Sequence, residues 1–96
     1  MLNILVACAN GAGTSLMMKM TVEKVIASMD LKVGKLHHCS LSEGKSMATQ
    51  FDIVLCPLNF ITMFKDAEDK GVKVVGLRNV LSQQEMEEKL TEAGVK

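Results

Sequence analysis

The sequence predicts an α/β protein in which four parallel strands form one sheet with helices on both faces. Residues 2–7 and 52–56 are short runs of apolar side chains, typical of strands buried on both faces of a parallel sheet. Each predicted strand precedes a segment with helical spacing of apolar residues, so strands and helices alternate along the chain. A chain of 96 residues, 48% of them hydrophobic, suffices for one packed core but not for two. We therefore expect a single domain over residues 1–96.

The helix predicted after the first strand spans residues 13–29 and carries one apolar stripe. Methionine is frequent in this segment, and its simplest role is to fill the core with a flexible side chain. We expect Met17 and Met20 to widen the buried stripe, with the charged residues on the solvated face. The stripe itself consists of Met18, Val22, Val25, Ile26 and Met29.

Residues 32–39 are the predicted second strand, placed at an edge of the sheet because polar residues separate its apolar ones. His37 and His38 are near its end, and neighbouring strand residues point to opposite faces, so the two cannot easily share a metal ion. They are expected to be surface or edge histidines, although a histidine that receives or relays a phosphoryl group is the alternative. A capping box at Ser40 and Glu43 then opens a short helix.

The second half of the chain continues the alternation. The strand at residues 52–56 is stopped by Pro57, because proline cannot continue the ladder of hydrogen bonds. Asn59 is expected to cap the next helix, which ends at Gly71 in a left-handed conformation. Residues 72–77 are the fourth strand. The apolar face of the helix between these strands consists of Phe60, Met63, Phe64 and Ala67.

The last predicted helix begins with a second capping box, formed by Ser82 and Glu85. Leu81 and Met86 have the spacing of a hydrophobic staple across its first turn, and the helix ends by Gly94. Its inward-facing residues are Met86, Leu90 and Ala93.

Four successive strand–helix pairs favour a flavodoxin-like sheet with strand order 2-1-3-4. In that order, the loops after the first and third strands flank the crevice where such sheets bind ligands. Cys8 follows the first strand and Cys56 ends the third, so both are near this crevice. Because Pro57 follows Cys56 and no glycine-rich loop does, Cys56 is expected to be a pocket wall or a core residue.

Composition excludes several classes of function. With 11 basic and 11 acidic residues, no tryptophan and no tyrosine, the chain lacks both the charge and the stacking platform of nucleic-acid-binding proteins. Its apolar runs are too short to insert in a membrane, and its start lacks the features of a signal peptide, so we expect a cytoplasmic protein. Cys8, Cys39 and Cys56 form no Cys-x-x-Cys pair, which argues against disulfides and against a structural metal site.

The candidate site begins at Cys8, which ends the first apolar run and precedes two glycines, two hydroxyl residues and a helix. A helix N-terminus favours anions, so it also favours a thiolate over a thiol and lowers the pKa of a cysteine placed there. Gly11 and Gly13 let backbone amides turn inward around a bound group. The pattern predicts a nucleophilic thiolate in a phosphate cradle. The alternative is a buried structural cysteine beside a tight turn.

Other anion-binding loops fit the residues less well. A nucleotide-binding P-loop needs lysine after its last glycine, where this chain has Thr14, and a dinucleotide-binding loop needs a third glycine where it has Leu16. Low-molecular-weight cysteine phosphatases share the expected fold and the spacing from Cys8 to Ser15, but they carry arginine at the position of Thr14. The segment after the third strand also offers no carboxylic acid for hydrolysis. Such a site is suited to hold a phosphoryl group and pass it on.

The pattern Cys-x-x-Gly-x-Gly-Thr-Ser resembles the phosphorylation loop of EIIB components of the sugar phosphotransferase system (PTS), of the ascorbate type in the galactitol–ascorbate superfamily. Residues 75–82, Val-Gly-Leu-Arg-Asn-Val-Leu-Ser, are similar to that group as well. The resemblance covers residues 1–96 as an EIIB type-2-like domain. It implies that Cys8 accepts a phosphoryl group from the phosphohistidine of an EIIA protein and passes it to a sugar, L-ascorbate, carried by the membrane component EIIC. The loop that it assigns to phosphate binding consists of Ala9, Asn10, Gly11, Ala12, Gly13, Thr14 and Ser15.

The implied relay uses no metal ion and no cofactor. Within it, Arg78 either steers an acidic partner or is simply a surface residue. A low-molecular-weight cysteine phosphatase or an arsenate-reductase-like enzyme on the same fold is the alternative function. A regulatory domain that is phosphorylated on Cys8 only as a signal is a further one.

Overall fold

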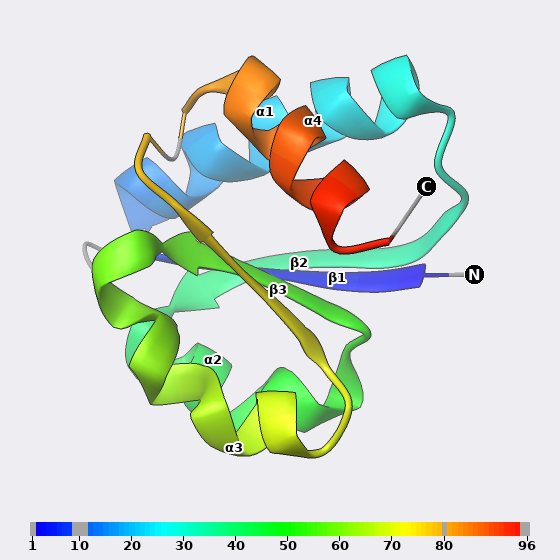
Figure 1. Cartoon of the computed structure of the whole chain (residues 1–96). Coiled ribbons are helices and arrows are strands. Elements are labelled where there is room, and N and C mark those ends of the chain that lie inside the picture. Colours follow the sequence, from blue (N-terminus) through cyan, green and yellow to red (C-terminus); the bar gives the residue numbers. More distant parts are fainter. Residues whose placement is uncertain (1, 9–11, 80, 95–96) are drawn as a thin grey trace.

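The computed structural model describes residues 2–8, 12–79 and 81–94, and of residues 12–15 it describes the backbone alone (Figure 1). Strands and helices alternate as predicted, with two 3₁₀ helices, η1 and η2, in addition. The elements are β1 (Leu2–Cys8), α1 (Ala12–Met29), β2 (Val33–Ser40), α2 (Leu41–Met47), η1 (Ala48–Gln50), β3 (Ile53–Pro57), η2 (Leu58–Phe64), α3 (Lys65–Asp69), β4 (Lys73–Leu77) and α4 (Gln83–Glu92).

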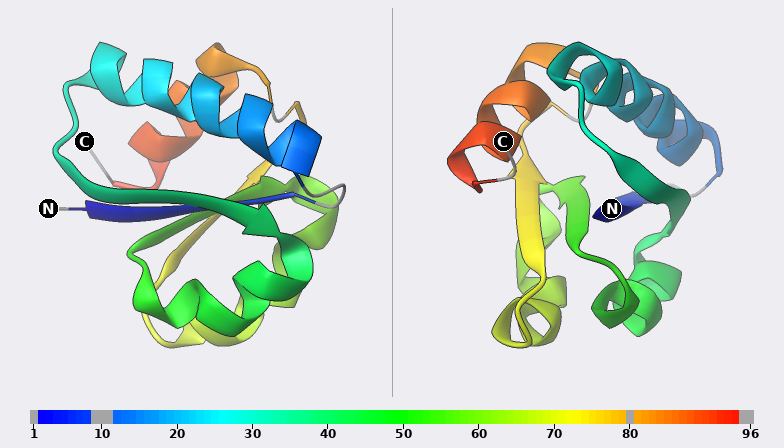
Figure 2. Two further views of the ribbon diagram at one scale, coloured as in Figure 1. Left: turned by 180° about the vertical axis from the view of Figure 1, so that it is seen from behind. Right: turned by 90° about the vertical axis from the view of Figure 1, so that its right-hand side faces the viewer.

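The sheet has the order β2-β1-β3-β4, and all neighbouring strands are parallel. This confirms the predicted α/β fold and its 2-1-3-4 order. Helices α1 and α4 cover one face, and α2 and α3 cover the other, as Figures 1 and 2 show from three sides. The carboxyl ends of all four strands therefore lie at one end of the molecule, opposite the N-terminus.

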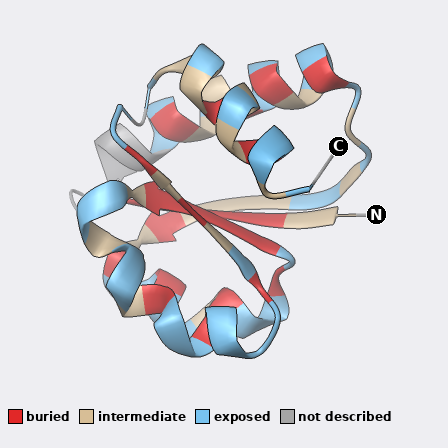
Figure 3. Cartoon of the chain, viewed as in Figure 1, coloured by how far each residue is buried: buried red, intermediate tan, exposed pale blue. Residues whose placement is uncertain are grey.

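Strand β1 is buried on both faces, as its apolar sequence predicts, and Figure 3 shows the sheet as the most buried layer. Residues Ile4 to Cys8 are each at most 3% exposed. Because side chains alternate along a strand, Ile4, Val6 and Cys8 join the core beneath α1 and α4, whereas Leu5 and Ala7 join the core beneath α2 and α3. The central strand thus contributes to two separate cores.

In α1 the structure corrects the expected width of the buried stripe. Met18, Val22 and Val25 are fully buried, but Met17 and Met20 are each 54% exposed. Each helical residue turns the side chain by about 100°, so neither position shares the direction of Met18. Only one side of α1 contacts the sheet and α4, and these two methionines therefore lie in solvent.

The segment after β3 also differs from its prediction. The expected α-helix capped by Asn59 begins instead as the 3₁₀ helix η2, with Pro57 at its N-cap and no side-chain cap. A 3₁₀ helix has three residues per turn, so Leu58, Ile61 and Phe64 align along one side of it. The predicted cap at Asn59 is therefore wrong, because contacts with the sheet select a tighter helix than the apolar spacing indicates.

Gly76 in β4 makes this close packing of η2 possible. A Cβ atom at Gly76 would lie 2.5 Å from Ile61 Cγ2 and 2.8 Å from Leu58 Cδ1. Only glycine leaves room for η2 at this distance. The α-helical part that follows, α3, is five residues long, and Gly71 ends the segment with a φ of 99°, in the left-handed region that was predicted.

Candidate functional site

Cys8 is the last residue of β1, the strand with neighbours on both sides. Its side chain is 3% exposed and belongs to the core cluster that contains Met18 of α1, Leu77 of β4 and Met86 of α4. Helix α1 begins four residues later, at Ala12, and runs for 18 residues. The predicted order of thiol and helix is therefore present, and the thiol shares one core cluster with side chains of α1, β4 and α4.

Part of the predicted phosphate loop lies outside the described residues, namely Ala9, Asn10 and Gly11. The remaining loop residues are placed by their backbone in the first turn of α1, and none of them is acidic. The four N-terminal N–H groups of a helix have no partner within the helix, and its dipole is positive at this end. Because no carboxylate offsets that field, the start of α1 is suited to a negatively charged group. The four residues of this turn are Ala12, Gly13, Thr14 and Ser15.

The other two cysteines belong to the opposite core. Cys39 and Cys56 pack beneath α2 and α3, and all three cysteines are free thiols. Burial raises the pKa of Cys56 to about 12, and its thiol donates a weak hydrogen bond to the Val75 carbonyl at 3.9 Å. Burial, with a smaller contribution from Glu43, raises the pKa of Cys39 to about 11. Both remain protonated at neutral pH, so of the two roles expected for Cys56 the core residue is the one observed.

The loop between β4 and α4 is held by a single carboxylate. The backbone N–H groups of Arg78 and Asn79 donate hydrogen bonds to Glu85, at 2.7 and 2.8 Å. Ser82 accepts a hydrogen bond from the Glu85 N–H at 3.2 Å, which confirms the predicted N-cap. The Glu85 side chain, however, binds two amides further back than a capping box requires. This clamp fixes the backbone of the Arg-Asn segment directly after the strand that ends at Leu77.

The two backbone hydrogen bonds lower the pKa of Glu85 below its usual 4.5, with smaller contributions from the positive charges of Lys89 and Arg78. A depressed pKa in the folded state stabilises the fold above the unfolded-state pKa, and the benefit is lost as pH falls through the folded-state value. We expect Glu85→Gln to lower the free energy of unfolding at pH 7 by about 1 kcal/mol. This is less than hydrogen bonds to a buried charged group contribute, because solvent screens the partly exposed Glu85 carboxylate.

Urea unfolding between pH 7 and pH 3 measures this effect. The stability difference between the wild type and Glu85→Gln should shrink as the pH falls below 4.5. Glu88→Gln is the matched control on the same helix, because Glu88 accepts only a long side-chain hydrogen bond from Gln84, at 3.4 Å. A Glu88→Gln variant as unstable as Glu85→Gln would contradict the clamp.

His37 and His38 are half-buried on β2, at the edge of the sheet. The ring of His37 stacks on Phe51 with centroids 6.4 Å apart, on the face covered by α2 and α3, whereas His38 pairs with Val6 of β1. Across the part of the chain that the structure describes, no group of three His, Cys, Asp or Glu side chains could hold a metal ion. The positions agree with the expected edge histidines, and the phosphoryl-relay alternative stays untested.

Comparison with known proteins identifies the family. Residues 3–92 match the family model described as "PTS system, Lactose/Cellobiose specific IIB subunit". The chain belongs to the PTS IIB family. The resemblance found from the cysteine loop is thereby confirmed, and membership places this PTS IIB protein in a phosphoryl-transfer system that transports sugars.

Curated relatives agree with this membership. The ascorbate-specific PTS system EIIB component of Mycoplasma pneumoniae is 29% identical over 90 residues, which cover 94% of this chain and 92% of the relative. The protein of the same name from Salmonella typhimurium is 32% identical over 89 residues, which cover 93% of this chain and 85% of the relative.

A solved structure, the lactose-specific IIB component domain from Streptococcus pneumoniae, superposes with a TM-score of 0.66 at 17% identity. The match covers 96% of this PTS IIB chain and 89% of the solved one, and at this identity it shows a shared fold. Among the helices described here, none is long and apolar enough to cross a membrane.

Proposed function

We propose that this PTS IIB protein carries a phosphoryl group on Cys8 between an EIIA protein and a sugar bound to the membrane component EIIC. The observation that carries the proposal is the position of Cys8, at the end of the central strand and four residues before an 18-residue helix without a carboxylate in its first turn. Because the curated relatives are named as ascorbate-specific, the sugar in this proposal is L-ascorbate. The reaction takes place on the cytoplasmic side of the membrane.

The transfer consists of two displacements at phosphorus. In the first, the Cys8 thiolate attacks the phosphohistidine of EIIA, so that an S–P bond forms, the P–N bond breaks and the imidazole keeps the bonding electron pair. In the second, a sugar hydroxyl attacks the same phosphorus. An O–P bond forms, the S–P bond breaks, the thiolate is restored, and the hydroxyl proton leaves to a base or to water. Neither step needs an oxidant, a metal ion or a nucleotide.

In this proposal the backbone amides of residues 9–15 and the dipole of α1 spread the charge of the transferred group. Thr14 and Ser15 donate hydrogen bonds to its oxygens or to sulfur. The EIIA and EIIC partners follow from the family, and the loop residues serve both steps.

Two features favour a relay over a cysteine phosphatase. The chain has Thr14 where the phosphatase pattern has arginine, so no guanidinium clamps the phosphate from within the loop. Residues 58–64, which follow β3 at the same end of the sheet, contain no acidic side chain to protonate a leaving group. Glu85 is at this end as well, but two backbone amides already occupy its carboxylate.

The test is phosphoryl transfer from the phosphorylated EIIA of the same organism, followed by intact mass measurement and mapping of the modified residue. We expect one phosphoryl group, on Cys8, that persists in water and leaves when EIIC and L-ascorbate are added. Cys39 and Cys56 serve as internal controls, because their raised pKa values keep them protonated. Hydrolysis of the label within seconds would favour the phosphatase, and absence of any label on Cys8 would refute both.

A further inference from the structure

An apolar patch lies on the outer side of α1, within three turns of its start. Leu16 is 46% exposed, and Met17 and Met20 are each 54% exposed, although Met18 between them is fully buried. Residues three and four positions apart are neighbours on a helix surface, so Met20 lies beside both Leu16 and Met17. The three side chains therefore form one continuous apolar surface, which we call the α1 patch.

The α1 patch is part of a wider distribution of exposed apolar side chains. Three further large hydrophobic residues are exposed in the described part of the chain, namely Leu58 and Ile61 in η2 and Leu81 in the β4–α4 loop. Figures 1 and 2 show that η2, this loop and the first turns of α1 all lie at the end where the strands have their carboxyl ends. The large exposed apolar side chains of the described residues thus belong to elements that begin or lie at the end of the molecule that carries Cys8.

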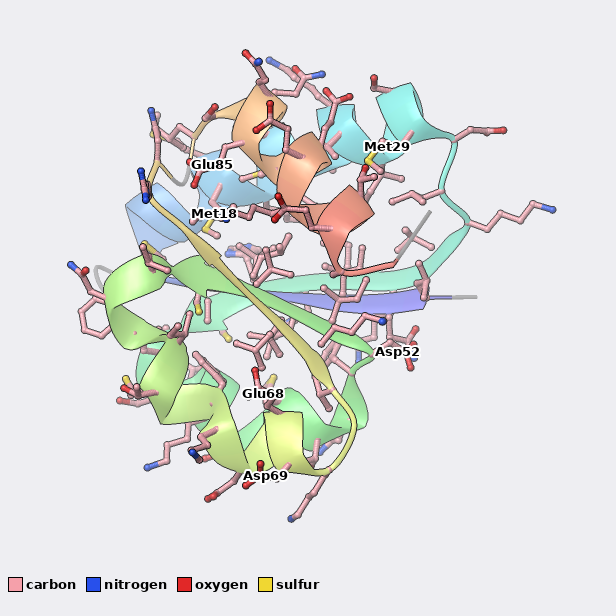
Figure 4. All side chains as sticks on the ribbon, viewed as in Figure 1. Met18, Met29, Asp52, Glu68, Asp69 and Glu85 are labelled. Atoms are coloured by element: carbon pink, nitrogen blue, oxygen red, sulfur yellow. The ribbon has the colours of Figure 1, made fainter. Side chains whose placement is uncertain are left out.

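Charged side chains are scarce in the segments that carry these exposed apolar residues. Residues 12–22 contain one charged side chain, Lys19, residues 57–64 contain none, and residues 78–82 contain only Arg78. The carboxylates at this end are engaged, since Glu85 binds two backbone amides and Glu43 accepts from the Ser40 hydroxyl. The loops at the opposite end are charged instead, and residues 30–32 and 70–72 contain Asp30, Lys32 and Lys70. Asp52, for example, lies there in Figure 4, far along the sheet from Met18 and Glu85.

We propose that the α1 patch, together with Leu81, is the surface on which the phosphohistidine donor protein docks. The inference rests on the proposed function and assigns residues to its first step. A helix rises 1.5 Å per residue, so Met20 is only about 12 Å along the axis from Ala12, where α1 begins. A protein that brings a phosphohistidine to Cys8 therefore covers this part of α1.

The residues of the α1 patch indicate which kind of surface the donor protein presents to it. Methionine and leucine present flexible apolar surface, which adapts to a partner that binds briefly and leaves. Lys19 adds a positive charge beside the patch, and the exposed Glu23, one turn from both Lys19 and Met20, adds a negative one, so the surrounding charge is mixed. The donor is therefore expected to offer an apolar centre around its phosphohistidine.

Methionine-methyl NMR tests the docking without any transfer. The chain has eight methionines, and titration with unphosphorylated EIIA of the same organism should shift the methyl signals of Met17 and Met20. Met18 and Met86 are fully buried and serve as internal controls whose signals stay in place. Saturation of binding with no shift at Met17 or Met20 would overturn the proposed surface.

Transfer kinetics separate this inference from the function on which it rests. The double variant Met17→Lys/Met20→Lys should raise the EIIA concentration for half-maximal phosphorylation roughly tenfold, with the final yield on Cys8 unchanged. Ala27→Lys/Ser28→Lys is the matched control, because it places the same two charges on exposed positions of α1, two turns beyond Met20. Equal half-maximal concentrations for the two variants would refute the surface while Cys8 still accepts the group. No label on wild-type Cys8 would refute the proposed function itself.

Discussion

Replacing Cys8 by serine is expected to abolish phosphoryl acceptance, with a fall in transfer rate of at least roughly a thousandfold. A thiolate is a far better nucleophile at neutral pH than a hydroxyl group, whose proton is not released in this range. Intact mass after incubation with phosphorylated EIIA measures the result, and the wild type run in parallel sets the scale. Cys8 is 3% exposed, so a polar replacement there affects packing. Thermal unfolding of Cys8→Ser therefore checks that the variant is folded.

Matched controls come from the other two cysteines. Cys39→Ala and Cys56→Ala remove buried thiols from the core beneath α2 and α3, on the opposite face of the sheet from Cys8. Both variants should accept a phosphoryl group at the wild-type rate after correction for any unfolded fraction. Full labelling of Cys8→Ser, or a label lost with Cys39 or Cys56, would move the acceptor away from the end of β1.

Gly76→Ala is expected to lower the free energy of unfolding by about 1–3 kcal/mol, which is the usual cost of an added carbon in a packed site. The new Cβ would lie 2.5 Å from Ile61 Cγ2 and 3.1 Å from Leu58 Cα, so the backbone of η2 has to move as well as its side chains. Urea unfolding measures the loss, and the melting temperature should fall by about 4–8 °C per kcal/mol in a domain of this size.

A double-mutant cycle shows whether this contact is the cause. Leu58 and Ile61 are 39% and 37% exposed, so truncating both to alanine costs little in the wild-type background. In the Gly76→Ala background the same truncation should restore part of the lost stability, because the Ile61 Cγ2 and Leu58 Cδ1 atoms are removed. Additive effects of the three substitutions would show that η2 does not depend on the missing Cβ of Gly76.

Local features of the fold follow directly from the sequence. The Ser82 hydroxyl accepts from the N–H three residues on, as its place before an amphipathic helix indicates. Gly71 has the positive φ expected at the end of a helical segment. Each of these features depends on residues within one turn of chain, so a short stretch of sequence contains all the information needed.

Features set by contacts between distant residues were predicted wrongly or missed. Apolar spacing predicts an α-helix from Asn59, yet the approach of Ile61 to Gly76, fifteen residues away, selects a 3₁₀ helix. The spacing of Ser82 and Glu85 identifies a cap, but not that the carboxylate clamps Arg78 and its neighbour. No local pattern reveals which backbone amides lie nearby once β4 and α4 have packed.

The α/β fold, its strand order and the position of Cys8 between the central strand and the first helix all follow from the amino-acid sequence alone. Buried runs, turn residues and their order along the chain suffice for this, because parallel strands with intervening helices allow few arrangements. Which side chains of α1 are exposed depends instead on how the helix packs against the sheet. Met17 and Met20 are apolar like the core residues. The orientation of α1 about its own axis, however, directs them away from the sheet and leaves them in solvent near the candidate site.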